Sequence, residues 1–483
     1  MIAREPGDVV RAEVERIELD PALLASVRAN RSAMLAALDS AEGPIYGVNT
    51  GMGRLAGVRL SAAQQAEHQR NLLVGRAVGG PPWLSPELTR ALMIMRLRSF
   101  LRPEAAVSAE LVSFLVDRLN DGFTPAVPRG GLGSSGEIIP LAHAFQTFIG
   151  LGSVLEDGAV VSAAEALRQR GVQPFELGPK EGASLIQGSP LAQAYAWQLS
   201  GSVHQLVDLQ TLCAAIAVDV MGAPRAVYQY SIPNPHVTAV LADVTRLTWG
   251  AAARPGVVQA PVSVRVGPRV IGFLDQVSAD LVATLRESWD TPGDSPSFVD
   301  GAFVPTTGYH AADLGLRMDA VKAAVVHVGE VAVQRLHRLL DPQFSGLPAQ
   351  LAVDPGPQAG LTPLHKRAVG ELHALRRLAA PATIGSLDTS AGQEDVQAFA
   401  WAAGAELETA IEHLFAITAC ELIAGAQARH LAEGDGAQGL AGAYRWIAAT
   451  VPPVLVDRPL GPDVERLVAV CRETYLDDLS DLA

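Results

Sequence analysis

Apolar residues recur at helical spacing along most of the chain. In residues 23–40, Leu23, Val27, Met34 and Leu38 fall on or near one face of a helix, which is the spacing of a helix that packs on one side. The same spacing predicts helices in the ranges 62–101 (broken at 79–83), 107–120, 138–150, 191–221, 270–289, 312–340, 364–378, 396–430 and 444–450, and a charged helix from Val464. Several reach about 30 residues, against a mean of about 11–12, and alternating strand patterns are scarce. We therefore predict an all-α fold, a bundle of long helices.

Glycine-rich polar segments interrupt this pattern. Residues 43–53, here called the lid loop, contain four glycines and the lone tyrosine Tyr46. A long glycine-rich loop can move and place a phenol in a site, as lids do; the alternative is an ordinary connector with a packed tyrosine. Residues 222–269, with six prolines, are expected to be irregular, and residues 291–310 form a Pro/Gly/Ser-rich insertion.

The distribution of loops and long helices predicts two domains. Residues 1–190 are expected to form an N-terminal helical domain that carries the lid loop and a serine-containing loop at 131–137. Residues 191–483 are expected to form the central long-helix bundle and the C-terminal helices. Helices this long, with several apolar faces, usually pack against other subunits as well, so we expect a homo-oligomer.

Composition excludes several classes of partner. With 37 basic and 51 acidic residues the net charge is −14, which disfavours nucleic acid. Cys213, Cys420 and Cys471 lie far apart without metal-binding spacing, so we expect core thiols in a reducing compartment and no metal site.

The first six residues contain no apolar segment of the secretory type. The apolar run 414–427 is short for a membrane span and carries Glu421, so we expect a cytoplasmic protein without a membrane segment.

The stretch 131–143 suggests a reactive group. If the nitrogen of Gly136 reached the carbonyl carbon of Ser134, and Ser135 then lost its hydroxyl as water, the backbone would become a five-membered ring with an exocyclic methylene. Such a ring is an electrophile, and glycine, which lacks a Cβ, allows the tight turn that closure needs. The amides of the following helix would add positive potential. A plain Gly/Ser turn that caps a helix remains the alternative.

Three motifs in collinear order carry a family resemblance. They are Tyr46-Gly-Val-Asn-Thr-Gly-Met-Gly53, the stretch Gly133–His143 and Thr389-Ser-Ala-Gly-Gln-Glu-Asp395. Together they resemble the histidine and phenylalanine ammonia-lyase family, which also contains tyrosine lyases and 2,3-aminomutases, and the resemblance extends over residues 19–430. It implies a homotetramer with active sites shared between subunits, acting on a small amino acid. It also implies that the tripeptide at 134–136 becomes a methylidene-imidazolone ring, without external cofactor or metal.

The resemblance assigns roles to other residues. Tyr46 matches the lid tyrosine that removes the β-proton, and Glu394 matches a glutamate near the amine. Arg265 matches the arginine that pairs with the substrate carboxylate, a role that suits a planar, two-pronged guanidinium. Further substrate-contacting positions are implied at Gln187, Gln259 and Tyr309. The family ring makes the amine a better leaving group, so that proton removal gives an α,β-unsaturated acid and ammonia; re-addition of ammonia would give a β-amino acid.

The sequence departs from the family pattern around this pocket. Ser134 replaces an alanine, which ring closure tolerates because the side chain takes no part in it. Glu137 replaces an aspartate, and Gln187 an asparagine. A family tyrosine is replaced by Val262, and family asparagines by Gly392 and Ser295.

Arg76 is the most informative departure. It stands where histidine lyases carry a histidine, and phenylalanine lyases an apolar residue, against the substrate side chain. A buried cation needs an anionic or accepting partner. That partner is either an acidic or richly hydrogen-bonding substrate or a site carboxylate such as Glu394, and the sequence leaves both open.

These observations lead us to expect an amino acid ammonia-lyase acting on a non-standard or polar/acidic amino acid. One alternative is a 2,3-aminomutase that uses the same chemistry. The others are a non-catalytic homologue and a ring-less enzyme that reuses the pocket.

Overall fold

The computed structural model of the protein describes residues 16–230 and 232–476. The first six residues, where the sequence shows no secretory segment, lie outside the described residues. The described chain forms two compact units. Unit 1 comprises residues 16–198, 282–316 and 382–405, and unit 2 comprises residues 199–281, 317–381 and 406–476. This division is interleaved, whereas the sequence suggested a single boundary near residue 190.

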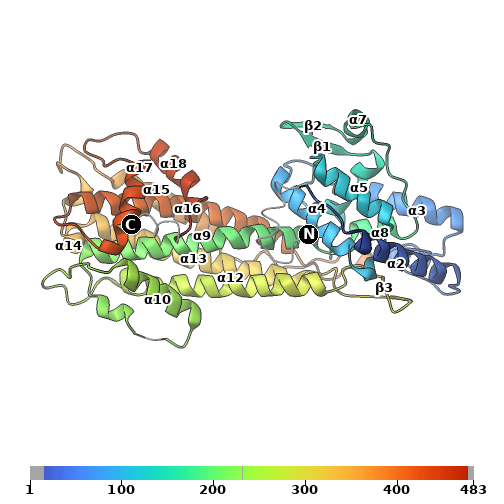
Figure 1. Cartoon of the computed structure of the whole chain (residues 1–483), viewed down its shortest axis with the longest axis horizontal. Helices are drawn as coiled ribbons and strands as arrows, with labels where there is room; N and C mark the ends of the chain where they lie inside the picture. Colours follow the sequence, from blue (N-terminus) through green and yellow to red (C-terminus); the bar gives the residue numbers. More distant parts are fainter. Residues whose placement is uncertain (1–15, 231, 477–483) are drawn as a thin grey trace. The chain divides into compact units, whose positions relative to one another are not determined.

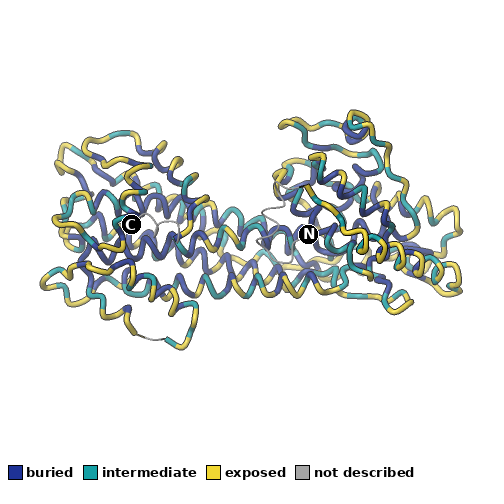
Figure 2. The backbone as a smooth tube through the Cα atoms, viewed as in Figure 1, coloured by how far each residue is buried: buried dark blue, intermediate teal, exposed yellow. Residues whose placement is uncertain are grey.

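The reason for the interleaving is that long helices contribute residues to both units. They are α9 (Pro190–Met221), α12 (Gly267–Asp290), α13 (Ala312–Leu340) and α16 (Ala400–Leu431) (Figure 1). Because the α16 helix is longer than the apolar run 414–427, it does contain a stretch apolar and long enough to cross a membrane, as does Glu181–Met221. The expectation that the apolar run 414–427 is too short for a membrane span was therefore wrong, because the whole helix is longer. Those stretches are instead 78% and 89% buried within the protein, as core helices are (Figure 2).

Unit 1 is built from shorter helices whose starts are encoded locally. The α4 helix begins with Pro86 in its first turn and with the Ser85 side chain accepting from the Leu88 amide, and α3 begins with a capping box from Ser61 and Gln64. Both are standard helix-start signals. The elements of unit 1 are α2 (Pro21–Asp39), η1 (Gly53–Leu55), α3 (Ala62–Val74), α4 (Pro86–Phe100), η2 (Pro103–Ala105), α5 (Ala109–Asn120), α6 (Ile138–Phe145), η3 (Gln146–Ile149), β1 (Ser153–Glu156), β2 (Ala159–Ser162), α7 (Ala163–Gln169), α8 (Glu181–Ile186), β3 (Ser297–Val299), β4 (Ala302–Val304) and η6 (Ser390–Gly392).

The strands form two small antiparallel hairpins, β1 with β2 and β3 with β4. Sequence patterning missed both of them, including the hairpin within the 291–310 insertion. Strands of three or four residues are too short to show a clear alternation of apolar and polar positions. The all-α prediction nevertheless holds, because helices supply the body of the fold.

Unit 2 contains a helix where irregular chain was expected. The α10 helix (Pro235–Leu247) begins with Pro235 in its first turn and with the Asn234 side chain accepting from the Val237 amide. Proline is well tolerated at that position, so it marks a helix start here. The other elements of unit 2 are η4 (Arg225–Tyr228), α11 (Val262–Arg265), α14 (Pro342–Ser345), η5 (Ala349–Leu351), α15 (Thr362–Arg377), η7 (Gln438–Leu440), α17 (Ala441–Thr450) and α18 (Gly461–Cys471).

Candidate active site

Most of the predicted site residues of unit 1 line one pocket of about 580 Å³. Loop segments at 44–52, 135–138, 186–188, 295–310 and 393–396 supply its lining. The lining includes the sequence-predicted residues Tyr46, Ser135, Gly136, Gln187, Tyr309 and Glu394. Ser134 lines a smaller neighbouring cavity together with Ser135, Gly136 and Tyr309. The polar loops that interrupt the helices therefore meet around a single space within unit 1.

The Ser/Gly turn sits immediately before α6, as the sequence predicted. The chain bends through residues 134–137, and the Ser134 hydroxyl donates to the Gly136 carbonyl oxygen at 2.5 Å. Ser135 and Gly136 both face the pocket. This tight turn, with a glycine whose nitrogen lies one residue beyond a serine, fits the ring that the resemblance implies. The α6 amides add positive potential next to it.

Glu137 anchors the turn to the start of α9. Its carboxylate accepts the amides of Leu191 and Ala192, each at 2.7 Å. Burial raises the pKa of Glu137 to about 7, although these two amides and the charge of Arg96 act in the opposite direction. The extra methylene relative to aspartate is thus accommodated, with the carboxylate bound to a helix N-terminus.

Tyr46 is placed by the lid loop. Its phenol oxygen accepts the amide of Gly53 at 2.8 Å, and Gly53 adopts φ +59°, a conformation that favours glycine. A backbone N–H aimed at the phenol oxygen stabilises negative charge there. Tyr46 is 37% exposed and lines the pocket, so its phenol is accessible to a ligand.

Glu394 connects its own loop to the serine turn. One carboxylate oxygen, Oε2, accepts the Ser135 amide at 3.1 Å and the Thr389 hydroxyl at 3.3 Å. The other, Oε1, accepts the Ser390 hydroxyl at 3.0 Å. The contact with Ser135 joins residues 259 positions apart in the sequence. It places a carboxylate directly beside the residue expected to become the electrophile.

Gln187 forms the wall on another side of the pocket. Its side-chain oxygen accepts the Ser295 amide, and its backbone carbonyl accepts from the Arg96 guanidinium. Because the Oε1 atom is engaged, the NH₂ group of the Gln187 amide is left as a donor for a ligand.

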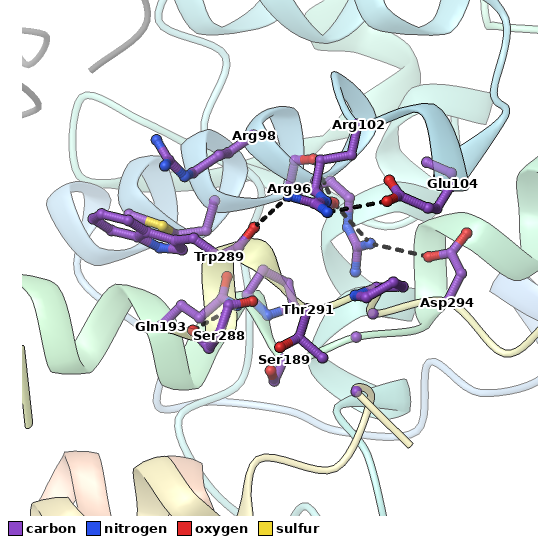
Figure 3. A pocket seen from close by; sticks show the side chains of 18 of the residues that line it. Arg96, Arg98, Arg102, Glu104, Ser189, Gln193, Ser288, Trp289, Thr291 and Asp294 are labelled. Atoms are coloured by element: carbon purple, nitrogen blue, oxygen red, sulfur yellow. Dashed lines mark hydrogen bonds and ion pairs between the residues drawn. The ribbon is translucent and has the colours of Figure 1, made fainter. Parts of the chain in front are cut away.

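A buried charge cluster supports this wall from behind, next to a small second cavity of about 40 Å³ (Figure 3). Arg96 points toward Asp294, with 4.0 Å between Nη1 and Oδ1 (Figure 3). Asp294 also accepts from Lys180 at 2.7 Å and from Ser184 at 2.6 Å. Burial lowers the pKa of Arg96 to about 10, against the opposing effect of Asp294. Sequence reasoning missed this cluster; a signal for it was the presence of Arg96 within the otherwise apolar stretch 91–97.

Three predicted substrate-binding residues do not line this pocket. Gln259 and Arg265 belong to unit 2, where the Arg265 Nε atom donates to the Ala260 carbonyl oxygen at 2.9 Å. Arg76 belongs to unit 1 but is also absent from the lining. Its charge interacts with those of Tyr46 and Glu394, so it lies near the site without lining the pocket.

Residues that bind metals do not cluster in the described chain. In residues 16–230 and 232–476, no group of three or more His, Cys, Asp or Glu side chains is arranged to hold an ion. The three cysteines are buried and free.

Known proteins resemble this chain over nearly its whole length. Residues 5–449 match the family model described as aromatic amino acid lyase. A histidine ammonia-lyase of Symbiobacterium thermophilum is 32% identical over 466 residues, covering 94% of this chain and 91% of that protein. Among solved structures, a tyrosine aminomutase from Streptomyces globisporus matches with TM-score 0.92 at 24% identity, over 99% of this chain and 96% of that one. An ergothionase from Treponema denticola matches with TM-score 0.90 at 21% identity, over 97% of both. The two structural matches establish the fold alone.

Proposed function

Because the chain belongs to the aromatic amino acid lyase family, we propose that it eliminates ammonia from an α-amino acid with a polar side chain. Membership makes the protein a carbon–nitrogen lyase or an amino acid aminomutase. The observation that carries the proposal is the contact of Glu394 with Ser135, in a pocket that also contains Tyr46. Residues remote in sequence are thereby brought together in the combination that this elimination requires.

The residues of the pocket have separate roles in the proposed reaction. A methylidene-imidazolone formed from Ser134, Ser135 and Gly136 would supply the electrophile that activates the amine for departure. Tyr46 takes the β-proton through its phenol oxygen, and the hydrogen bond from the Gly53 amide orients that oxygen. Glu394, held beside Ser135, is placed to interact with the substrate ammonium group.

The substrate carboxylate needs a cation that this pocket lacks. Among the described residues, no lysine or arginine belongs to the lining. Arg265 is the family match for that role, and it lies in unit 2, where the neighbouring Val262 is 60% exposed. We assign Arg265 and Gln259 of one copy to the pocket of another copy in a homotetramer. Such sharing accounts for a pocket without its own cation.

The pocket lining also indicates which kind of substrate side chain can bind. Tyr309, His310 and Gln393 offer polar groups, whereas the carboxylates Glu394 and Asp395 would repel an acidic side chain. With Arg76 outside the lining, the support for an acidic substrate falls away. A polar side chain without negative charge fits these contacts best. We further propose that the enzyme acts in the cytoplasm, which the three buried free thiols support.

Intact-mass spectrometry tests the proposal directly. The purified protein should be lighter than its sequence by two water molecules, because ring closure and dehydration each release one. Ser135→Ala should regain at least one water and lose activity, measured as ammonia release from a panel of amino acids that begins with L-histidine. Ser134→Ala is the matched control, because its side chain takes no part in closure, and it should keep both the mass deficit and the activity.

The products separate the two enzyme classes. A lyase releases ammonia with the unsaturated acid, and an aminomutase accumulates a β-amino acid isomeric with the substrate. A full-length mass without any deficit, together with no release of ammonia from the panel, would refute the proposal.

A further inference from the structure

The short loop Thr389–Asp395, here called the Glu394 loop, has an unusual backbone. Thr389 and Glu394 close it by paired backbone hydrogen bonds of 2.8 and 3.2 Å. Between them, Ser390, Ala391 and Gly392 adopt φ values of +53°, +54° and +82°. Left-handed conformations cost an L-residue about 1–2 kcal/mol each, so two non-glycine residues in succession need a compensating interaction. Strain of this kind is concentrated at functional sites.

The compensating interaction reaches the catalytic carboxylate. The left-handed turn brings the chain back so that the Ser390 hydroxyl donates to Oε1 of Glu394 at 3.0 Å. Oε2 is already bound to the Ser135 amide and the Thr389 hydroxyl. Ser390 is therefore the side chain that fixes the oxygen not bound to the serine turn. With both oxygens held, the carboxylate plane is fixed relative to Ser135.

Ser390 also lies close to the lid loop. A Cβ atom added to Gly53 would come within 3.8 Å of both Cβ and Oγ of Ser390, so the two residues face each other across a space that a methyl group would fill. Gly53 is the residue whose amide binds the Tyr46 phenol at 2.8 Å. One small side chain is therefore hydrogen-bonded to Glu394 and faces the residue whose amide binds the Tyr46 phenol.

We propose that Ser390 is a positioning residue that sets the orientation of the Glu394 carboxylate relative to the Tyr46 phenol. The inference rests on the proposed function, because it takes Glu394 and Tyr46 as the groups that act on the substrate. Ser390 itself is exposed and does not line the pocket, so it touches neither substrate nor ring. Its effect passes through Glu394. A hydrogen bond to an ionised group is stronger than a neutral one and more demanding in geometry.

A double-mutant cycle between Ser390 and Glu394 tests the inference. Ser390→Ala removes the hydroxyl and keeps the Cβ atom that faces Gly53. It should lower kcat about fivefold and change KM less than about twofold, since the substrate contacts remain. In the Glu394→Gln background the same substitution should change kcat by less than about 1.5-fold, because the carboxylate that Ser390 orients is gone. The assay uses the amino acid of the panel that releases most ammonia.

The matched control is Ala391→Gly, which relieves strain in the same turn but removes no contact with Glu394. It should leave kcat within about twofold of the parent. An equal loss from Ser390→Ala in both backgrounds, or a loss of the same size from Ala391→Gly, would overturn the inference in favour of a purely structural turn.

The mass deficit keeps this test separate from that of the proposed function. Ser390→Ala should retain the loss of two water molecules. If the parent protein shows no deficit, the proposed function has failed. If the deficit is present and the cycle is additive, only the role of Ser390 has failed. The cycle is also measured in the free energy of unfolding, where non-additivity reports the contact without need of a substrate.

Discussion

Two arginines, Arg335 in unit 2 and Arg76 in unit 1, differ in their partners: Arg335 is bound to a carboxylate, and Arg76 has no direct partner among the described residues. Arg335 on α13 is fully buried and donates to both oxygens of Glu421, at 2.7 and 3.0 Å, and to Gln210 at 2.6 Å. Burial alone would lower its pKa, but Glu421 more than compensates, so the pKa of Arg335 is raised. This is the two-pronged geometry in which a guanidinium binds a carboxylate most tightly.

Arg76, just beyond α3, has no such partner. Within residues 16–230 and 232–476 its side chain makes neither a hydrogen bond nor an ion pair, and it is only partly buried. Burial lowers its pKa, and the charges of Tyr46 and Glu394 act against that effect. The difference indicates that Arg335 fixes structure in unit 2, whereas Arg76 in unit 1 remains a cation near Tyr46 and Glu394 without a direct partner in the described chain.

Breaking the Arg335–Glu421 pair should have the largest effect on stability. Glu421→Gln leaves Arg335 buried without a counter-charge, and the free energy of unfolding should fall by about 3–5 kcal/mol. Urea unfolding measures the loss. The double variant Arg335→Met/Glu421→Leu is the matched control, because it removes both charges and fills the space with apolar atoms; it should recover most of the stability. A loss from Glu421→Gln below about 1 kcal/mol would contradict a structural role for the pair.

Glu137 should give a smaller, pH-dependent effect. Its pKa rises from 4.5 to about 7 on folding, so the folded state binds more protons between these values. Stability from this group is fully present below pH 4.5 and is lost as the pH rises through 7, a decline of about 3 kcal/mol in all.

Unfolding free energies at several pH values compare the parent with Glu137→Gln, which cannot ionise. The variant should lose this component of the slope between pH 5 and 7. If unfolding free energy falls with pH at the same slope in both proteins, the pKa of Glu137 is not raised, and the two amides of α9 hold its carboxylate ionised.

The sequence predicted the parts that depend on local pattern or on motif order. The helix expected at 312–340 is α13, because its amphipathic periodicity is local and uninterrupted. Tyr46, Ser135 and Glu394 were expected to meet, and they line one pocket. Two features were sufficient for this prediction. The motifs occur in the order of the family, and the loops that carry these residues all lie between helices.

The parts that sequence reasoning missed depend on context that local pattern does not contain. The α10 helix was hidden by Pro235, which breaks a helix in its interior but begins one in its first turn. The cluster of Arg96, Lys180 and Asp294 depends on contacts between remote segments. Arg265 matched its motif and fell within the predicted second domain, yet its absence from the pocket lining could not be read from the sequence, since only the folded chain shows which loops share a pocket.

Arg76 should give the smallest effect on stability and a clear effect on activity. Arg76→Leu breaks no pair among the described residues and relieves the burial of a charge, so unfolding free energy should change by less than about 1 kcal/mol. Without the cation near Tyr46 and Glu394, kcat/KM should fall about tenfold for every amino acid of the panel, with their ranking unchanged. Arg76→Lys, which keeps the charge, should retain most of the activity. A changed ranking of the amino acids would instead indicate that Arg76 contacts the substrate side chain, as the family position of this residue suggests.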